Sequence, residues 1–242
     1  LMTGSEGLLG VITEVTVKIL KAPEVVKAAL VGFPTIEDAG SCVAEIIAQG
    51  CIPAGMEIMD KALTKATNDY SKAGYPTDAE AMMIVEFDGT EHEVEDYIGK
   101  VKQIAEKNNS SSLKVSKSNE ERLKFWAGRK AAFPACGVLA PDYMCMDGSI
   151  PRGKLAEVLN EISRLSKKYD LPVANAFHAG DGNLHPLIMF DANNPDSLRK
   201  CEEFGADILK YCVKVGGALT GEHGVGIEKR ELMCEAFNDK DI

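Results

Sequence analysis

Two histidines flank a turn-like sequence in the stretch NAFHAGDGNLHPLIMF, residues 175–190. They are His178 and His185, and the chain of 242 residues has only four histidines. A two-residue hairpin turn at Asp181-Gly182 would place residue 178 opposite residue 185, with their β-carbons about 4.5 to 5.5 Å apart on one face. Two imidazole nitrogens so placed could bind one zinc-like ion at about 2.0 to 2.1 Å. The spacing is compatible with half of a metal site, but two isolated histidines at a hairpin end more often bond to backbone, so the interpretation requires a third ligand.

A second stretch, VGGALTGEHGVGIEKR at residues 215–230, offers a third ligand. Glycines surround Glu222 and His223, which is typical either of a flexible surface loop or of a backbone that must approach something closely. Glu222 could complete a set of two histidines and one carboxylate, leaving positions open for a substrate. His223 would then point elsewhere and remain free as a base.

Three further polar or aromatic residues could contribute to the site or serve only the fold. Arg129, in FWAGRKAAF, could hold a substrate carboxylate through the fork of its guanidinium group, although arginines on helices are commonly solvated. We expect Trp126 to belong to the core and His92, in an acidic helix start, to lie on the surface.

Composition excludes several classes of protein. The charge is 27 − 37 = −10 with no cluster of basic residues, so we expect no nucleic-acid partner. Seven cysteines without a C-x-x-C pair indicate reduced thiols in a cytoplasmic protein. No apolar run approaches the roughly 20 residues of a spanning helix, and no leader is recognisable. We expect no transmembrane segment, and any contact with the inner membrane to be peripheral and made through partners.

Strand-like and amphipathic helical stretches alternate along the chain. The opening segment is expected to be a glycine-rich loop followed by an alternating strand, and a helix is expected to be capped at Asn119. Because no G-x-G-x-x-G motif follows a strand, a dinucleotide-binding sheet is not favoured. The expected fold class is α+β and ferredoxin-like, with an antiparallel or mixed sheet and helices packed mainly on one face. Later strands are predicted at 25–33, 81–89, 110–118 and 141–150, and helices at 35–50, 92–108, 119–133, 151–169 and 195–217.

Five motifs occur together and in order: GSEGLLGVITEVTVKIL, FWAGRKAAFPA, DYMCMDGSIP, HAGDGNLHP and TGEHGVGIEKR. In these motifs the chain resembles the C-terminal catalytic region of the FAD-linked 2-hydroxy-acid dehydrogenases and oxidases, which are flavoproteins of the vanillyl-alcohol oxidase type. The resemblance covers nearly the whole chain. It implies oxidation of a small D-2-hydroxy acid, glycolate or D-lactate, to the 2-oxo acid, with hydride transfer to FAD.

The resemblance also implies roles for individual residues. His178, His185 and Glu222 would hold a divalent metal, zinc or a similar ion, and His223 would act on the substrate. The metal would bind the substrate hydroxyl and a carboxylate oxygen, and Arg129 the remaining carboxylate oxygen. The residues that match positions beside the flavin are Gly4, Ser5, Gly7, Gly10 and Asn183.

A division into two parts follows from the same resemblance. Residues 1–22 correspond to the end of the flavin-binding domain and a connecting segment, and residues 23–242 to the substrate domain, truncated at its C-terminal end. We expect FAD to be held mainly by an N-terminal domain outside this sequence, so that the chain alone is inactive. Partner subunits or an electron-acceptor protein are expected.

Two other functions can be drawn from the same residues. A metal-dependent hydrolase would use His178, His185 and Glu222 to activate water and would need no flavin. A non-catalytic module that docks a partner subunit would bind no metal and would expose a large apolar surface.

Overall fold

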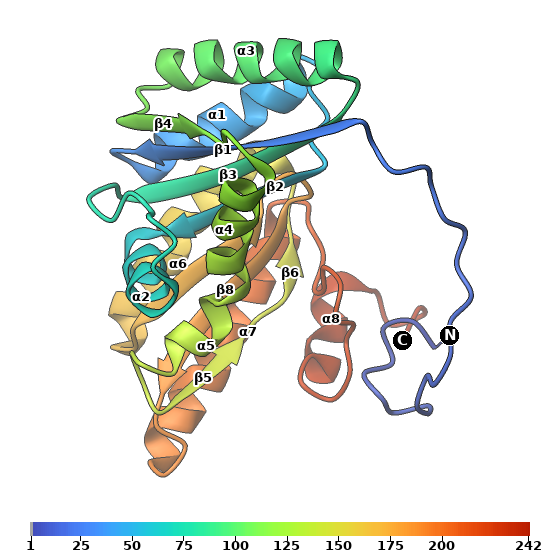
Figure 1. Ribbon diagram of the computed structural model, residues 1–242. Helices are drawn as coiled ribbons and strands as arrows, with labels where there is room; N and C mark the ends of the chain where they lie inside the picture. The colour runs from blue at the N-terminus through green and yellow to red at the C-terminus, as the bar shows by residue number, and fades with distance from the viewer. Residues whose placement is uncertain (1) are drawn as a thin grey trace.

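The computed structural model describes residues 2–242, and an antiparallel sheet of eight strands forms its centre (Figure 1). The strand order is β4-β1-β3-β2-β7-β8-β5, and the short strand β6 also pairs with β8. All the pairings are antiparallel. The strands are β1 (Val25–Phe33), β2 (Gly55–Asp60), β3 (Ala81–Gly89), β4 (Ser112–Val115), β5 (Asp142–Cys145), β6 (Gly148–Ser149), β7 (Val173–His178) and β8 (Asn183–Phe190).

Helices cover both faces of the sheet. The larger apolar cluster packs one face against α1 (Ile36–Ala48), α3 (Glu91–Lys107), α6 (Leu155–Tyr169) and α7 (Pro195–Lys214). The smaller cluster packs the other face against α2 (Lys61–Ser71), α4 (Asn119–Lys130) and α5 (Ala132–Cys136). Figure 1 shows α4 and α5 in front of the sheet and α6 and α7 behind it. Short helical turns complete the chain: η1 (Arg152–Lys154), η2 (Arg230–Leu232) and α8 (Met233–Ala236).

The predicted α+β class and antiparallel sheet are confirmed, and the longest helices do share one face. The second helical layer arises because consecutive residues of the central strands are apolar. In β1, Val31 packs into the larger cluster and Leu30 into the smaller one, since successive strand residues point to opposite faces. A sheet with two apolar faces must be covered twice.

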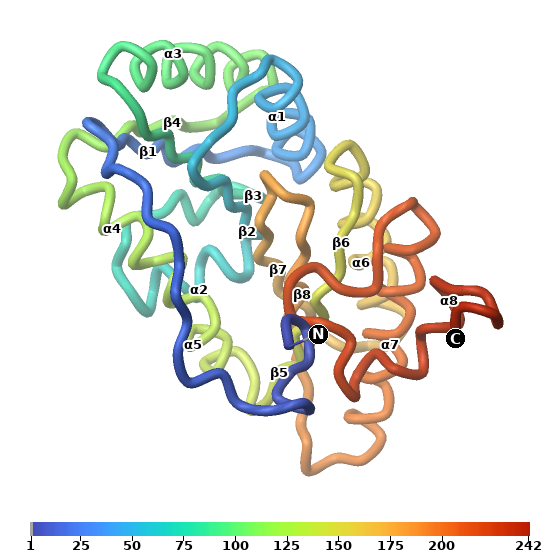
Figure 2. The backbone as a smooth tube through the Cα atoms, turned by 90° about the vertical axis from the view of Figure 1, so that its right-hand side faces the viewer, coloured from blue at the N-terminus to red at the C-terminus, as the bar shows by residue number. Residues whose placement is uncertain are grey.

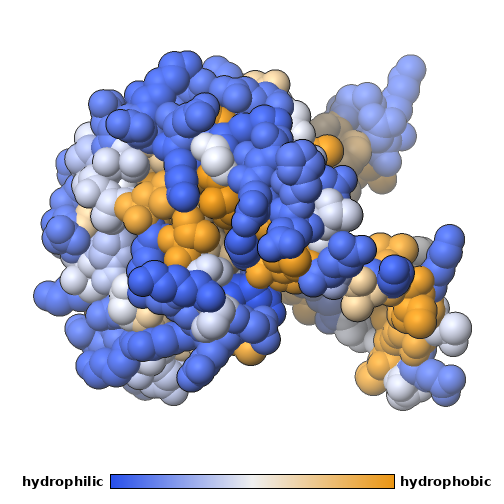
Figure 3. Space-filling model, turned by 45° about the horizontal axis from the view of Figure 1, so that its top comes forward, coloured by the Kyte–Doolittle hydropathy of each residue, from blue (hydrophilic) through white to orange (hydrophobic). Residues whose placement is uncertain are grey.

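The strand expected in the opening segment is wrong. Residues 11–22 have no regular secondary structure, and their apolar side chains, such as Val15 and Ile19, are largely exposed. An alternating sequence forms a strand only beside a partner edge, and within residues 2–242 this arm pairs with none. Figure 3 shows the apolar side chains gathered where the arm projects from the body at the lower right.

Two elements and one cap differ from the sequence-based expectations. Strand β2 and helix α2 were not predicted. Helix α4 begins at Asn119 as expected, but its N-cap is Ser118, whose hydroxyl accepts a hydrogen bond from the backbone N–H of Glu121 at 3.2 Å. The predicted helix at 151–169 begins instead with the turn η1 before α6.

The β7–β8 hairpin has a different register from the one predicted. His178 lies opposite Asn183, and His185 lies opposite Ala176, so four residues connect the strands instead of two. The connection packs against Ile150, whose backbone N–H donates to the Gly182 carbonyl at 2.9 Å. No local sequence pattern predicts this tertiary contact, which stabilises the four-residue connection. His178 and His185 nevertheless share a face as diagonal neighbours, and their ring centroids are 5.0 Å apart.

The membrane expectation can be compared with the helices directly. Within residues 2–242 no helix is both long enough and apolar enough to span a membrane.

Candidate metal centre

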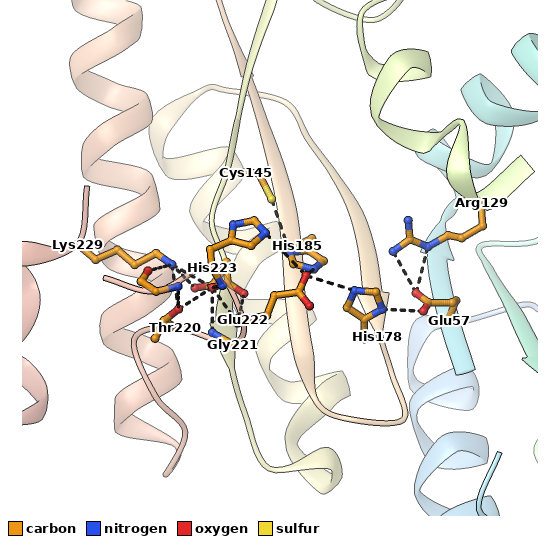
Figure 4. Close-up of polar contacts among 12 residues, drawn as sticks. Glu57, Arg129, Cys145, His178, His185, Thr220, Gly221, Glu222, His223 and Lys229 are labelled. Atoms are coloured by element: carbon orange, nitrogen blue, oxygen red, sulfur yellow. Dashed lines mark hydrogen bonds and ion pairs between the residues drawn. The ribbon is translucent and has the colours of Figure 1, made fainter. Parts of the chain in front are cut away.

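Two side chains of the β7–β8 hairpin and one from a later loop converge at one end of the hairpin (Figure 4). The Nε2 atoms of His178 and His185 lie 3.6 and 3.1 Å from Oε1 of Glu222. His178 ends β7, His185 lies inside β8, and Glu222 belongs to the loop that follows α7. The structure therefore brings together the three metal ligands predicted from the sequence.

These three side chains fit a zinc-like ion. Ligand atoms bound tetrahedrally at about 2.0 to 2.1 Å are roughly 3.3 Å apart, which is close to the two observed separations. The other ring nitrogens are occupied: His178 Nδ1 lies 2.6 Å from Glu57 Oε1, and His185 Nδ1 lies 3.7 Å from the Cys145 sulfur. Both histidines thus present Nε2 toward Glu222, the arrangement in which an outer partner orients each metal-binding imidazole.

A second grouping, of Asp147, His185 and His223, also has closely spaced ligand atoms. Asp147 is fully buried, and its carboxylate already accepts hydrogen bonds at 2.7 to 3.2 Å. An ionised carboxylate has about four acceptor sites, so little capacity remains for a metal. The set that includes Glu222 is the better candidate. The donors to Asp147 are Thr220 Oγ1, Lys229 Nζ and the backbone N–H groups of Gly221, Glu222 and His223.

Asp147 instead holds the loop that carries Glu222 and His223. Burial raises the pKa of Asp147, but the bond from the Thr220 hydroxyl, the backbone N–H of His223 and the Lys229 charge outweigh it and hold the pKa well below its usual range. Lys229 is buried as well, and its Nζ donates to the carbonyl oxygens of Asp147 and Gly224. The loop is therefore fixed from its interior, and Glu222 is directed at the histidines.

His223 lies at the exposed side of the site. Its ring stacks on His185 with centroids 5.3 Å apart, and its Nε2 is 3.7 Å from Glu222 Oε1. The side chain keeps 42% of its surface exposed. His223 is thus near the ligand set yet open to solvent, a position from which an imidazole can take up a proton and release it to water.

The two histidines of the candidate metal centre have different environments. The hydrogen bond to Glu57 raises the pKa of His178, whereas burial, followed by the nearby His178, lowers the pKa of His185. A low pKa keeps His185 neutral, as a metal ligand must be.

Arg129 is buried and ion-paired, in contrast to the solvated alternative. Its Nε and Nη2 both lie 3.0 Å from Glu57 Oε2, so Glu57 bridges Arg129 and His178 (Figure 4). Sequence reasoning missed Glu57 together with strand β2, although an acidic residue inside the apolar run GMEIMD was a usable signal. Trp126 is half-buried and donates to Glu86 at 2.5 Å, and His92 is exposed as expected.

Of the glycines predicted to lie beside the flavin, Gly4 lies against the 220–229 loop. Gly4, Gly7 and Gly10 have φ of 74°, 80° and 149°, and Ser5 lies between the first two. Gly4 contacts the loop through its backbone, because a β-carbon on Gly224 would be 2.0 Å from the Gly4 carbonyl oxygen. Figure 2 shows the N-terminal end beside this loop.

A cavity of about 320 Å³ lies beside the ligands. Asn183 lies at its wall, 7% exposed, and within the described residues its Oδ1 has no hydrogen-bond partner. Gly221 leaves room for this amide, since a β-carbon there would be 1.9 Å from Oδ1. A buried acceptor beside a cavity favours a polar ligand. The lining residues are Ser149, His178, Asp181, Asn183, Gly221 and Glu222.

Residues 22–242 match the family described as FAD linked oxidases, C-terminal domain. The chain belongs to this family. The resemblance predicted from the five motifs is thereby confirmed. The family match covers both strands of the hairpin, the 220–229 loop and helix α4, so every residue of the candidate metal centre lies inside it.

Individual relatives agree with this assignment. The chain is 52% identical to the glycolate oxidase subunit GlcD of Escherichia coli K12 over 242 residues, which are 100% of this chain and 48% of that protein. It is 36% identical to GlcD of Bacillus subtilis, over 93% of this chain and 48% of that protein. It is 35% identical to a mitochondrial D-lactate dehydrogenase [cytochrome] of Arabidopsis thaliana, over 98% of this chain and 43% of that protein. The chain spans about half the length of these relatives.

Solved structures of low sequence identity share the fold. A p-cresol methylhydroxylase with bound substrate aligns with a TM-score of 0.65 at 14% identity, covering 90% of this chain and 48% of that one. The 4-ethylphenol oxidase of Gulosibacter chungangensis aligns with a TM-score of 0.63 at 12% identity, covering 85% of this chain and 47% of that one.

The convergence of the ligands predicts the effect of removing them one at a time. His178→Ala and His185→Ala should each abolish retention of a divalent metal, because two ligands do not replace three. Metal content after gel filtration in chelator-treated buffer measures this, with circular dichroism to follow folding. His92→Ala, at an exposed helix start, is the matched control and should keep the metal. Full occupancy in either ligand variant would exclude the hairpin site.

The hydrogen bonds and the ion pair of Asp147 predict that its contribution to the free energy of unfolding depends on pH. Asp147→Asn should lower the free energy of unfolding by about 3 kcal/mol at pH 7, the cost of breaking a buried ion pair. Since the folded pKa is lowered, this contribution is present above the unfolded pKa near about 3.9 and is lost as the pH falls below it. Urea unfolding should therefore show a smaller difference in the free energy of unfolding between the variant and the wild type at about pH 3 than at pH 7.

A matched control for that measurement is Asp196→Asn, which removes an exposed pair with Arg199 at the start of α7. It should change the free energy of unfolding far less than Asp147→Asn does, because solvent screens an exposed pair. Limited proteolysis should cut the 220–229 loop only in the Asp147 variant. Equal stability of the two variants at pH 7 would show that Asp147 does not hold the loop.

Proposed function

We propose that the chain supplies the substrate-binding half of a flavin-dependent dehydrogenase or oxidase that converts a small D-2-hydroxy acid, glycolate or D-lactate, to the 2-oxo acid. The observation that carries the proposal is the convergence of His178, His185 and Glu222 beside a polar cavity, with His223 at its open side. The names of the relatives, a glycolate oxidase subunit and a D-lactate dehydrogenase, support the substrate class.

Each group of the site has a role in this chemistry. When bound, a divalent cation, zinc or a similar ion, supplies activation of the substrate hydroxyl, and FAD supplies the hydride acceptor. His178, His185 and Glu222 would hold the cation. His223 would accept the hydroxyl proton at Nε2 and release it to solvent.

Arg129 remains a proposed partner of the substrate carboxylate. Its Nε and Nη2 are engaged with Glu57, so Nη1 is the nitrogen that would meet the substrate. Asn183 would present its amide from the cavity wall to the substrate or the flavin. The residues that would pass along the flavin are Gly4, Ser5, Gly7 and Gly10.

We also propose the division at residue 22. The arm would connect the substrate domain, residues 23–242, to a flavin-binding domain. Of the residues in the first part of this division, Leu1 lies outside the described residues. The exposed apolar side chains of the arm support this role, because they find no partner within residues 2–242. We infer that FAD is held mainly by that other domain.

Partner proteins follow from the same comparison. Two of the relatives carry the name of a subunit, which supports a complex with other subunits or with an electron-acceptor protein. We place the protein in the cytoplasm, in contact with the inner membrane only through such partners. Membership of an FAD-linked family favours this function over a metal-dependent hydrolase.

Turnover by the full-length protein tests the function. Under anaerobic conditions, glycolate and D-lactate should bleach the flavin absorbance and reduce an artificial electron-accepting dye, whereas L-lactate should do so far more slowly. The 2-oxo acid should appear in equal amount to reduced dye. Hydrolysis of ester or amide substrates without flavin bleaching would support the hydrolase instead.

The roles of Glu222 and His223 can be separated. Glu222→Gln should weaken metal binding by more than the roughly 10- to 100-fold cost of changing an outer partner, because a direct ligand is lost. His223→Ala should retain the metal and substrate binding but lose about 10² to 10⁴-fold in rate, as removal of a general base does. Metal titration and single-turnover flavin reduction measure the two effects. Loss of metal on changing His223 and its retention on changing Glu222 would reverse the assignment.

A further inference from the structure

We propose that Glu57, held in place by Arg129, is a positioning residue of the candidate metal centre: it fixes His178 in the orientation and tautomer that direct Nε2 at the other ligands. This inference rests on the proposed metal site and adds an outer partner to it. Glu57 would touch neither substrate nor metal.

The sheet brings Glu57 to His178. Strands β2 and β7 are antiparallel neighbours, and Glu57 lies directly opposite His178 in their register. Residues opposite one another share a face of the sheet with their β-carbons about 4.5 to 5.5 Å apart. The Glu57 carboxylate reaches His178 Nδ1 at 2.6 Å. An ionised carboxylate can only accept a hydrogen bond, so Nδ1 donates in this contact, and in the neutral imidazole Nε2 is then the nitrogen that can bind a metal.

Arg129 fixes the other end of the carboxylate. Its contacts through Nε and Nη2 go to Oε2, which leaves Oε1 for the histidine. Both side chains are 10% exposed, and a carboxylate this deeply buried requires a paired cation to remain ionised. The contact also restricts rotation of the carboxylate, so Oε1 stays directed at Nδ1.

Helix α4 is itself held where Arg129 needs it. The Tyr75 hydroxyl donates to the Phe125 carbonyl, one helical turn before Arg129. Gly128 permits this close approach, because a β-carbon there would be 2.2 Å from the Tyr75 hydroxyl oxygen. The position of the guanidinium group is therefore set by packing of the helix and not by the ion pair alone.

His178 needs such a partner more than His185 does. The His185 side chain is 3% exposed and is held by surrounding atoms, whereas the His178 side chain is 31% exposed. An imidazole with that much free surface could rotate or adopt the other tautomer. The hydrogen bond from Nδ1 to Glu57 removes that freedom.

Arg129 would therefore act on both the substrate and the candidate metal centre. If it also meets the substrate, changing it disturbs both the substrate and, through Glu57, the metal ligand His178. Loss of activity in an Arg129 variant would not separate these effects. A readout of metal binding and of the His178 tautomer is needed.

The test is Glu57→Gln in the full-length protein, with zinc affinity measured by competition with a chromophoric chelator. The variant keeps the shape of the side chain but loses its charge, and it should bind zinc about 10- to 100-fold more weakly, as changes to outer partners of zinc ligands do. The absorption spectrum of the cobalt-substituted protein should shift as well, because the orientation of one imidazole has changed.

The matched control is Glu86→Gln. Glu86 lies on the neighbouring strand β3 and accepts from Arg122 at 2.9 Å, so it repeats the pairing of a sheet carboxylate with an arginine of α4 but contacts no histidine. The zinc affinity of the Glu86→Gln variant should stay within twofold of that of the wild type. An equal loss in both variants would mean that such pairs act only on folding, and would overturn the proposal.

Nitrogen NMR of the wild-type imidazoles gives an independent result that does not depend on the variant folding. A proton on Nδ1 of His178 supports the proposal, and a proton on Nε2 overturns it. Wild-type protein that binds no zinc, or a His178→Ala variant that binds it normally, would remove the metal site itself. Zinc binding that depends on His178 but is unchanged in Glu57→Gln would leave that site intact and remove only the role of Glu57.

Discussion

The pairing of β7 with β2 on one side and with β8 on the other is the constraint on which the site depends. It places Glu57, His178 and His185 on one face of three adjacent strands. Backbone hydrogen bonds of the sheet fix the main-chain positions of these three residues before any ligand arrives, so little of the main chain has to be ordered on binding. Only Glu222 and His223 must be supplied by a loop.

The loop solves a different physical problem. Glycine-rich backbone is entropically costly to order, and this segment must hold a carboxylate close to two imidazoles. The buried Asp147 carboxylate gathers consecutive N–H groups of the loop, and Lys229 neutralises it while satisfying nearby carbonyl oxygens. The buried Asp147–Lys229 pair thus fixes the backbone of the loop, as the hydrogen bonds of the sheet fix the backbone of the histidines. Glu222 is left on the outer side, 52% exposed, where ligands can reach it.

Sequence reasoning found the residues that do chemistry better than those that hold them. His178, His185 and Glu222 could be found because rare residue types lie beside glycines, and the two histidines share a strand face even though the predicted hairpin register was wrong. The register itself depends on the contact with Ile150, which no local pattern encodes. Glu57 and Asp147 were missed because the sequence shows an acidic residue in an apolar or mixed stretch but not what that residue faces in the fold. The strand predicted in the arm was wrong because an alternating sequence forms a strand only where a partner strand lies beside it.

The contact between Gly4 and Gly224 has a consequence for how the two halves of such an enzyme work together. Gly224 has a φ of 104°, and any side chain there would collide with the Gly4 carbonyl. The segment around Gly4 and the loop that carries Glu222 therefore meet backbone to backbone at this point. If that segment leads toward the flavin, as proposed, a displacement of one backbone would move the other, and the spacing between substrate and flavin would depend on both.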